Sequence, residues 1–474
     1  MPAGDSPDVL VARFLRANNY HETFQAFIRE TNLTGDSITN HPTDLTIEQI
    51  LEEKKLYDLA VRFEKINVDA KDVDFVVPYP TVPTTLTTLS TSFNILSVSL
   101  ASLMLPTEDS TTQPSSQQVI ISTSSDKSLR IYSAKPPYTL LTTFSNLHAG
   151  PILCVAAISQ RWLVTASMVG AITISDLKGN IVDKWTGHTK YIVKIAVSEP
   201  IESQNGADGE EETRYLAAAS YDKSLSVHKL YLPKAMNSTS EIDIPSPRLE
   251  FLQTIKFDQT VEDVIFTKDY RADNPTQEPS STPLLITTIR DSPYLHIWST
   301  PSNNSSTTSS STTTSSAQFT FTSKNPLNAT STSWLTYTPT SLTPHPHHPH
   351  LLAMITSSIP SPKAIIYNLS TYTVDKEFTV PVELSAYSTG IVAWRGDTSA
   401  SGLWINGDDG VIKGVEIKSG KVKAELKGHS GRKVRCLAAA AVSEEDGEEE
   451  EELMISGGFD GGLNVWRIGD DASV

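Results

Sequence analysis

The sequence predicts a mainly β protein in which seven similar sheet-forming units follow a short helical region. The first observation is a tight turn followed by a strand with alternating apolar residues, a pattern that recurs along the chain. It is clearest near the C-terminus, where two apolar runs flank the turn at Asp460 and where Leu463 and Val465 alternate with polar residues. The second observation is that residues 8–30 have the three- and four-residue apolar spacing of helices.

The last unit resembles one blade of a WD-repeat β-propeller. Gly428 and His429 precede it, and Trp466 follows the turn residue Asp460 by six positions. In that family a His, a strand Ser, the turn Asp and the Trp form one hydrogen-bonded chain, since the polar groups of a short turn must be paired once they are buried. The resemblance implies such a network in two blades, at His429, Ser456, Asp460 and Trp466 in the last and at His188, Ser220 and Asp222 in the third.

Seven units are expected from the turn-and-strand spacing, and their first strands can be placed. These strands are expected at residues 94–105, 152–157, 192–197, 261–266, 333–337, 389–394 and 434–439. Sheets that repeat in this way bury their faces on their neighbours. The last unit stops near Ile468, too early for a fourth strand of its own, so residues 84–89 are expected to supply that strand and close the ring.

The helical region carries the pattern Leu10, Phe14, Leu15, Tyr20, Thr23, Phe27 and Glu30. This pattern resembles a LisH motif, a short helical hairpin that usually dimerises. Asn19 stands where that family prefers Gly, and Asn tolerates the left-handed backbone that Gly supplies. Two short helices cannot bury so many aromatic side chains alone. Pairing with a second copy is therefore expected, and packing of the helices on the propeller is the alternative. The residues expected to dimerise are Leu10, Phe14, Leu15, Tyr20, Phe24, Phe27 and Ile28.

These observations divide the chain into three parts. Residues 1–66 are expected to be a LisH-like helical dimerisation region, with a third helix at residues 46–65. Residues 67–83 contain Pro and Thr without helical spacing and are expected to be a linker. Residues 84–474 are expected to form the propeller. The predicted fold class is therefore mainly β, a seven-bladed WD-repeat β-propeller preceded by a small α-helical LisH-type region.

The composition narrows the classes of function. The net charge of −17 argues against sequence-independent binding of nucleic acid, which relies on Lys and Arg. The two cysteines, Cys154 and Cys436, fall in predicted buried strands, so neither a disulfide framework nor a zinc site is expected and a reducing compartment fits. The longest apolar run, residues 93–105, is too short to span a membrane, and no signal peptide is evident. We expect an intracellular protein, cytoplasmic or nuclear, without membrane contact.

The long insertions are expected on one face of the ring. Those between the first and second strands of a unit are residues 106–118, 198–213, 268–283, 339–350 and 443–452, and those between the third and fourth are residues 233–247 and 300–317. The opposite face then carries only short loops, on which binding residues need little ordering. Aromatic residues and Arg anchor interfaces. The residues expected to bind partners on that face are Tyr191, Tyr221, Asp263, Arg290, Trp334, Arg432 and Phe459.

Other polar segments give weaker signals. A Pro-alternating tract carries His345, His347, His348 and His350, and we interpret it as a loop, with a transition-metal site as the alternative. Residues 444–452 are rich in Glu and are interpreted as a solvated run, with a site for a basic tail as the alternative. No catalytic residue, metal or cofactor is expected, because the sequence lacks the phosphate-binding, hydrolase and metalloprotease motifs.

The resemblance implies a homodimeric, non-enzymatic scaffold whose propellers bind protein or peptide partners, with avidity from the two joined copies. The combination is similar to the dynein regulator of the lissencephaly type, to co-repressor subunits and to propeller subunits of ubiquitin-ligase complexes. One alternative is therefore a subunit of a chromatin, RNA-processing or ubiquitin-ligase complex. The other is a propeller enzyme with a site in its central channel, for which the candidates are His188, Glu262 and Asp263.

Overall fold

The computed structural model describes most of the chain. The described residues are 7–31, 33, 74–86, 93–105, 115–201, 211–233, 246–271, 280–301, 318–327, 338–357, 362–385, 388–397, 399–442 and 451–468. They form two compact units, a pair of helices and a β unit. The expected third helix at residues 46–65 and the expected strand at residues 333–337 lie outside the described residues.

The helical unit is a hairpin of α1 (Pro7–Ala17) and α2 (His21–Thr31). Asn19 joins the two helices with a φ of 59°. This is the left-handed conformation expected there, which Asn adopts more readily than most residues. The backbone N–H of Tyr20 donates to the carbonyl of Leu15 at 2.9 Å, which closes the end of α1.

The β unit contains seven antiparallel sheets of four strands each. From the inner to the outer strand, the first three sheets are β2 (Ile95–Leu105), β3 (Ser115–Ser124), β4 (Leu129–Ser133) and β5 (Leu140–Phe144); β6 (Ile152–Ile158), β7 (Trp162–Ser167), β8 (Ala171–Asp176) and β9 (Ile181–Thr186); and β10 (Ile192–Val197), β11 (Glu211–Ser220), β12 (Ser224–Pro233) and β13 (Arg248–Lys256).

The remaining four sheets continue the same order. They are β14 (Val261–Asp269), β15 (Ser280–Ile289), β16 (Tyr294–Ser299) and β17 (Thr320–Pro326); β18 (Pro339–Pro344), β19 (Leu351–Thr356), β20 (Lys363–Asn368) and β21 (Thr373–Thr379); β22 (Val392–Trp394), β23 (Gly402–Ile405), β24 (Val411–Glu416) and β25 (Val422–Lys427); and β26 (Val434–Val442), β27 (Glu451–Gly458), β28 (Leu463–Arg467) and β1 (Val82–Thr85).

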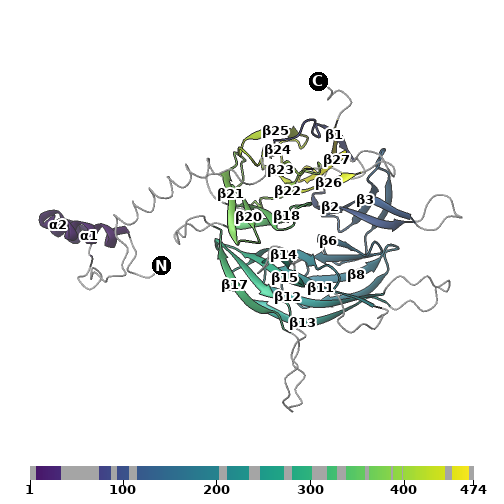
Figure 1. The fold of residues 1–474 in the computed structure, drawn as a ribbon, viewed down its shortest axis with the longest axis horizontal. Helices are drawn as coiled ribbons and strands as arrows, with labels where there is room; N and C mark the ends of the chain where they lie inside the picture. Colours follow the sequence, from purple (N-terminus) through teal and green to yellow (C-terminus); the bar gives the residue numbers. More distant parts are fainter. Residues whose placement is uncertain are drawn as a thin grey trace, which may run out of the picture. The chain divides into compact units, whose positions relative to one another are not determined.

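The sheets form a seven-bladed propeller, as predicted. Figure 1 shows the first strands, such as β6, β14 and β18, near the centre and the fourth strands, such as β13 and β17, at the periphery. The second strands are buried on both faces, which is why β19 is a continuous apolar run. Among the described residues, seven apolar clusters hold the ring together, one between each pair of neighbouring sheets.

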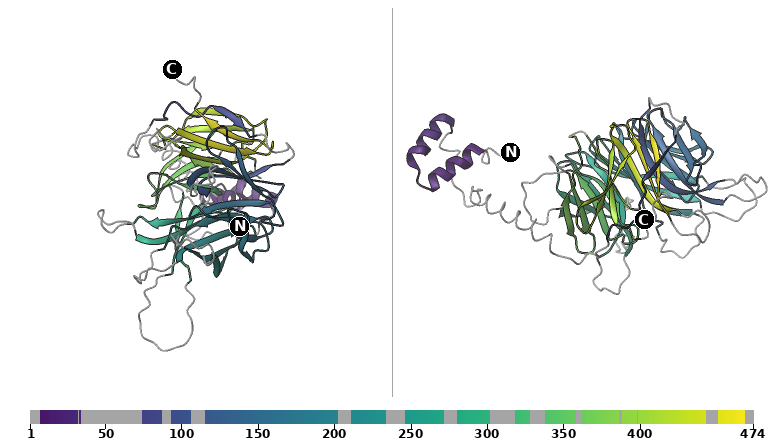
Figure 2. Two further views of the ribbon diagram at one scale, coloured as in Figure 1. Left: turned by 90° about the vertical axis from the view of Figure 1, so that its right-hand side faces the viewer. Right: turned by 90° about the horizontal axis from the view of Figure 1, so that it is seen from above.

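An upstream strand completes the last sheet and closes the ring. β1 pairs antiparallel with β28, with Val82 opposite Arg467. The closure is the one predicted, but the strand begins at Val82 instead of Thr84. In Figure 2 the yellow C-terminal sheet lies beside the blue sheet that begins with β2, and the cluster between the two contains Ile95 and Ile455. The ring therefore has no open junction at its seam.

The fifth sheet differs from the prediction. Its first strand is β18, so the interpretation of residues 339–350 as an insertion is wrong for residues 339–344, and only residues 345–350 connect β18 to β19. Pro339 and Pro344, which suggested a loop, lie at the two ends of this strand. Because β18 is an edge strand of its sheet, Pro is tolerated there.

The expected linker, residues 67–83, includes residues that belong to the propeller. Phe75 is 7% exposed and lies in the apolar cluster between the sixth and seventh sheets. Its ring meets that of Trp404 edge-on, with the ring centres 6.1 Å apart. Gly402 and Gly414 leave room for this ring, since a Cβ would lie only 2.7 Å from it at Gly402 and 2.9 Å from it at Gly414.

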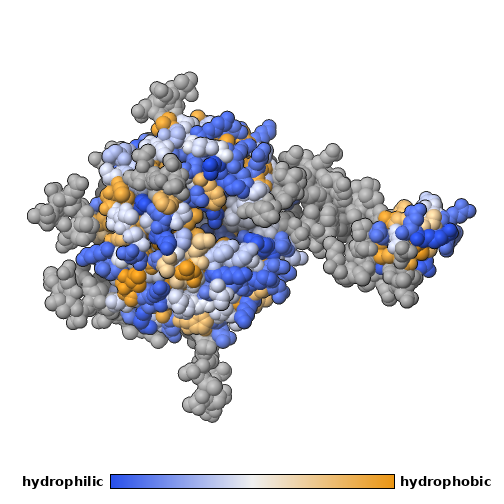
Figure 3. Space-filling model, turned by 180° about the vertical axis from the view of Figure 1, so that it is seen from behind, coloured by the Kyte–Doolittle hydropathy of each residue, from blue (hydrophilic) through white to orange (hydrophobic). Residues whose placement is uncertain are grey.

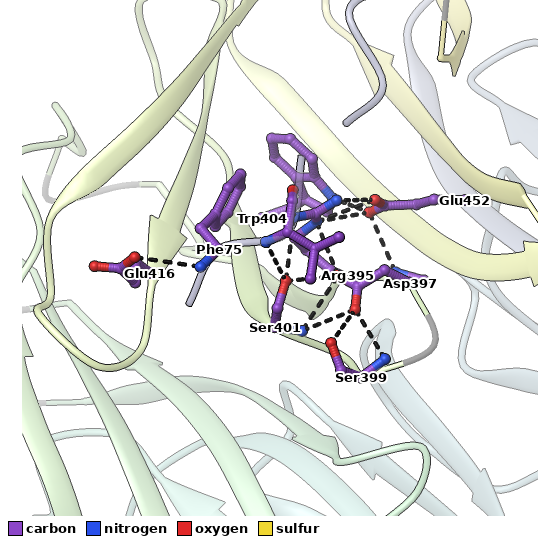
Figure 4. Close-up of polar contacts among 10 residues, drawn as sticks. Phe75, Arg395, Asp397, Ser399, Ser401, Trp404, Glu416 and Glu452 are labelled. Carbon is purple, nitrogen blue, oxygen red and sulfur yellow. Dashed lines mark hydrogen bonds and ion pairs between the residues drawn. The ribbon is translucent and has the colours of Figure 1, made fainter. Parts of the chain in front are cut away.

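A buried polar network fastens the same segment to the ring (Figure 4). The guanidinium of Arg395 donates to the carbonyl of Val76 at 2.7 Å and to a carboxylate oxygen of Glu452 at 2.5 Å. Glu452 also accepts a hydrogen bond from the indole N–H of Trp404 at 2.8 Å. The interpretation of residues 444–452 as a solvated run is therefore wrong for Glu452, whose partner Arg395 is supplied by the neighbouring sheet.

Candidate functional site

His429 ties together the last blade. Its Nδ1 lies 3.0 Å from Asp460 and its Nε2 lies 2.8 Å from the hydroxyl of Ser456. Trp466 donates its indole N–H to the same hydroxyl at 2.8 Å. Burial acts to raise the pKa of Asp460, but hydrogen bonds from His429 and the backbone N–H of Gly462 lower this pKa to about 2. The four side chains lie within one blade, where they hold its turn.

The third blade has a different network from the one expected. His188 Nδ1 lies 3.1 Å from Asp222, but its Nε2 lies 2.9 Å from Ser226. Ser220 does not join this chain and hydrogen-bonds to backbone carbonyls instead. Ala218 occupies the position, four residues before the turn Asp, at which the last blade has its Ser. A serine on the next strand therefore substitutes for the missing hydroxyl.

A cavity of about 750 Å³ opens at the centre of one face of the ring, and the third to seventh sheets supply its lining residues. This face, here called the short-loop face, is formed by the turns between second and third strands and by the residues that begin the first strands. The turns are short: only residues 221–223 separate β11 from β12, and residues 459–462 separate β27 from β28. Short turns on a rigid sheet need little ordering when a partner binds.

Bulges at the start of four of the first strands place side chains in the wall of this cavity. The pairing register of β10, β14, β18 and β26 with their neighbours shifts across the second residue of each strand. A residue left out of the ladder in this way is free to point elsewhere. The four residues at these shifts all line the cavity; they are Val193, Glu262, Thr340 and Arg435.

Two stacked tyrosines form the aromatic part of the wall. The rings of Tyr191 and Tyr221 are 4.7 Å apart and inclined by 16°. The guanidinium of Arg290 and the ammonium of Lys190 lie 5.4 Å and 5.3 Å from the centre of the Tyr221 ring. Both distances are within the range of a cation–π interaction. Burial raises the pKa of Tyr191, so this phenol stays neutral in the physiological range.

Two carboxylates in the wall have cationic partners. Glu262 accepts from Arg290 Nε at 2.5 Å, and burial raises the pKa of Glu262 despite this pair. Asp408 lies 2.9 Å from the ammonium of Lys433 and accepts from the hydroxyl of Ser388 at 2.6 Å. Burial acts to raise the pKa of Asp408, but these hydrogen bonds lower it. Both carboxylates are thus already paired.

Asp263 is buried beside the bulge and is not among the lining residues. It accepts hydrogen bonds from the backbone N–H groups of Val264 at 2.7 Å and Leu342 at 2.8 Å, and Lys194 Nζ lies 3.6 Å away. Burial raises the pKa of Asp263, and the nearby carboxylate raises the pKa of Lys194. The carboxylate therefore joins the fourth sheet to the fifth and does not face a partner.

The cavity brings together four of the seven residues predicted to bind partners, Tyr191, Tyr221, Arg290 and Phe459. Asp263 is buried, Arg432 is exposed but does not line the cavity, and Trp334 lies outside the described residues. The sequence interpretation missed Lys433 and Arg435. Arg435 interrupts an otherwise apolar first strand, and that interruption was the available signal.

The helical unit leaves the residues predicted to dimerise at least partly accessible. None of the seven is buried, and Tyr20 is 53% exposed. The rings of Phe14 and Tyr20 lie 6.4 Å apart at the junction of the two helices. Figure 3 shows hydrophobic side chains at the surface of this unit. Neither α1 nor α2 has the length and apolarity needed to cross a bilayer.

The histidine tract is built into the propeller. His345 is buried, its ring lies 4.4 Å from that of Trp394, and its Nδ1 accepts from the backbone N–H groups of His347 and His348. Burial lowers the pKa of His345 to about 4. Within the part of the chain that the structure describes, no three His, Cys, Asp or Glu side chains are grouped to hold a metal ion.

Comparisons with known proteins agree with this architecture. Residues 7–36 match the LisH domain, and residues 420–467 match the WD domain, G-beta repeat. No curated protein sequence matches the chain. The crystal structure of Saccharomyces cerevisiae Sqt1 is similar in fold, with a TM-score of 0.50 and 12% identity over 82% of this chain and 99% of that one. The protein thus carries an N-terminal LisH domain and a WD repeat within a seven-bladed β-propeller.

Proposed function

We propose that this protein is a non-enzymatic scaffold that binds protein or peptide partners on the short-loop face of its propeller and forms a homodimer through its LisH helices. The cavity on that face carries the proposal. It gathers Tyr191, Tyr221, Arg290 and Phe459, which are aromatic and Arg residues of the kind that dominate binding energy at interfaces.

The chemistry of the cavity supports binding over catalysis. Its described lining residues include Ser357 and Ser388 but no His, the side chain that most often activates a serine nucleophile, and no Cys. Its carboxylates Glu262 and Asp408 are held by Arg290 and Lys433. In the His–Ser–Asp set of the last blade, His429 and Ser456 are buried, and none of the three side chains is among the lining residues of this cavity.

Affinity capture with cavity variants tests the binding face. Full-length protein and the variants Tyr221→Ala and Phe459→Ala are used as bait, and captured proteins are quantified by mass spectrometry. Phe251→Ala is the matched control, because Phe251 is an aromatic residue 47% exposed on the outermost strand β13. Both cavity variants should lose the same captured proteins, and the control should keep them. Retention of all partners by both cavity variants would refute this face as the binding site.

The partly exposed aromatic side chains of the helical unit support dimerisation. A second copy would cover Phe14, Tyr20 and Phe27, which the two helices leave at least partly exposed. Light scattering of the full chain should therefore give a dimer, and Phe27→Asp should give a monomer because it places a charge in the apolar contact. Glu22→Gln, a change at an exposed position of α2, should leave the dimer intact. A dimeric Phe27→Asp variant would place the self-association elsewhere.

Two free thiols support an intracellular site of action. Cys154 and Cys436 lie on first strands β6 and β26, and both are buried and unpaired with each other. Burial raises their pKa to about 11 and about 12, so both stay protonated and inert. Free buried cysteines are typical of proteins that work in a reducing compartment.

A further inference from the structure

The acidic groups around the cavity have little capacity left for a partner. Glu262 is held by Arg290, Asp408 by Lys433, and Asp263 is buried beside Lys194. Asp291 is the remaining carboxylate of the wall; it is exposed, and a hydroxyl, that of Thr338, lies 3.4 Å from it. Three of the four carboxylates are therefore neutralised before a partner arrives.

The basic groups contrast with these carboxylates. Arg435 projects from the bulge of β26 into the cavity and has no ion pair or hydrogen bond to its guanidinium among the described residues. It lies close enough to Tyr191 for its positive charge to oppose the rise in pKa that burial causes in that phenol. The ammonium of Lys190 has only the ring of Tyr221 as a neighbour of this kind within the described part of the chain. Arg432, next to Lys433 in the chain, is exposed and without an ionic partner in the described structure.

A half-buried guanidinium whose donors have no partner among the described residues can bind an acceptor. Arg presents five N–H donors and binds carboxylates through two parallel hydrogen bonds. Low local dielectric inside a recess strengthens such a pair relative to one on an open surface. Two stacked rings beside it, those of Tyr191 and Tyr221, give a flat apolar surface against which a peptide can lie.

From this imbalance we propose that the cavity binds a segment of a partner protein rich in Asp and Glu, with one of its carboxylates paired to Arg435. This inference rests on the proposed function and adds the chemical class of the partner. A carboxylate fits better than a phosphate, because phosphate recognition in peptides uses clusters of Arg and the cavity wall offers one unpaired guanidinium among the described residues.

The net charge of the chain does not oppose this choice. The value of −17 favours basic partners at long range. At about physiological salt, however, charges more than about 8 Å apart are largely screened. The charge that a partner meets inside the cavity is then set by the groups of its wall, among which the guanidinium of Arg435 has no ionic partner in the described residues. The cationic hydrogen-bond donors at the cavity therefore affect the binding of a partner segment more than the net negative charge of the whole chain does.

Selection from a library of short random peptides tests the inference whatever the natural partner is. Peptides are selected on immobilised full-length protein, and the mean charge of the enriched sequences is compared with that of the starting library. The enriched peptides should be acidic. Their affinities for the wild type, Arg435→Gln, Tyr221→Ala and Arg248→Gln are then measured by fluorescence anisotropy. Arg248 is the control, since it lies on the outer strand β13 with its guanidinium over the ring of Tyr231.

Arg435→Gln should weaken binding by about tenfold or more, the usual loss when one partner of a desolvated charge pair is removed. Arg248→Gln should bind like the wild type, and circular dichroism should show that both variants are folded. Enrichment of neutral or basic peptides would overturn the inference, as would equal affinity for wild type and Arg435→Gln. If peptides of any charge still require Tyr221, the proposed binding face stands and only the acidic class fails. If none requires Tyr221, both fail.

Discussion

The ion pair between Arg395 and Glu452 gives a sharp test of how the ring is fastened. The side chain of Arg395 is fully buried and that of Glu452 is 2% exposed. In the variant Glu452→Ala, the guanidinium keeps one ionic partner, Asp397 at 3.2 Å. The indole N–H of Trp404 and the backbone N–H of Gly396 lose their acceptor. The substitution therefore leaves one buried cation poorly compensated and two buried donors unsatisfied.

The expected loss is large compared with that of an adjacent surface pair. Removing one partner from a buried ion pair costs about 3–5 kcal/mol, a range that includes the penalty of the unsatisfied donors. We therefore expect Glu452→Ala to lower the free energy of unfolding by about 4 kcal/mol. Glu451→Ala is the matched control. Glu451 is 49% exposed and pairs with Arg467 at 2.7 Å on the surface, and such pairs contribute only about 0–1 kcal/mol.

Urea unfolding followed by far-ultraviolet circular dichroism measures both variants. The slope of the free energy against urea concentration should match the wild type, because neither substitution changes the surface exposed on unfolding. The Glu452→Ala curve should shift to much lower urea, and the Glu451→Ala curve should nearly overlay the wild type. Equal shifts for the two variants would refute the argument that burial decides the worth of these charges.

Two further predictions use the same assay. Phe75→Ala should lower the free energy of unfolding by about 3 kcal/mol, because the ring is buried against Trp404. Phe251→Ala, at an exposed ring, should change it by less than about 1 kcal/mol. Similar losses in the two variants would show that Phe75 does not anchor its segment. Burial lowers the pKa of His148 from 6.5 to about 4. The unfolded chain therefore takes up this proton first as the pH falls, so stability is complete above pH 6.5 and declines toward pH 4. Between about pH 7 and about pH 5 the decline through His148 should be about 2 kcal/mol, and His148→Gln should be less sensitive to acid by that amount; an unchanged pH dependence would contradict a buried neutral imidazole.

The blade pattern was readable from the sequence because it depends on local chemistry. The turn at Asp460 and the alternation of Leu463 and Val465 follow from the backbone conformation and burial of residues that are close together in the sequence. The first strand of the fifth sheet, β18, was not predicted at residues 339–344, because Pro residues such as Pro339 and Pro344 are typical of loops. Whether Pro is tolerated in a strand depends on whether the strand lies at an edge, and that is a property of the assembled sheet.

The packing of Phe75 and the pairing of Glu452 were not readable for a related reason. Phe75 packs against Trp404, a residue hundreds of positions away, and its space is created by Gly402 and Gly414. Glu452 stands at the end of a Glu-rich run, where composition alone predicts solvation. Only the position of Arg395 on the neighbouring sheet makes this one Glu a buried partner. Long-range pairing of single side chains leaves no periodic signal in the sequence.

Four of the residues predicted to bind partners line the cavity and Asp263 does not, for reasons that differ in how local they are. Tyr221 and Phe459 begin short turns, whose position follows from the turn residues themselves. Along a regular strand, Asp263 and its neighbour Glu262 point to opposite faces, and the choice between them depends on the register. The bulge at the start of β14 sets that register, so that Glu262 lines the cavity and Asp263 is buried. A one-residue irregularity thus decides which of the two carboxylates lines the cavity.

These bulges allow the cavity wall to vary with little effect on the stability of the fold. A residue at a register shift makes no ladder pair, so its side chain can change while the neighbouring strand pairs persist. Arg435 is such a residue, and it has no partner to leave unsatisfied among the described residues. Arg435→Gln should therefore leave the free energy of unfolding within about 0.5 kcal/mol of the wild type while it weakens peptide binding. Glu452→Ala should lower the free energy of unfolding and leave peptide binding by the folded protein unchanged, because Glu452 pairs with Arg395 and does not line the cavity. A large loss of stability in Arg435→Gln would mean that the bulge holds the first strand in place, and the cavity could then no longer be varied independently of the propeller that carries it.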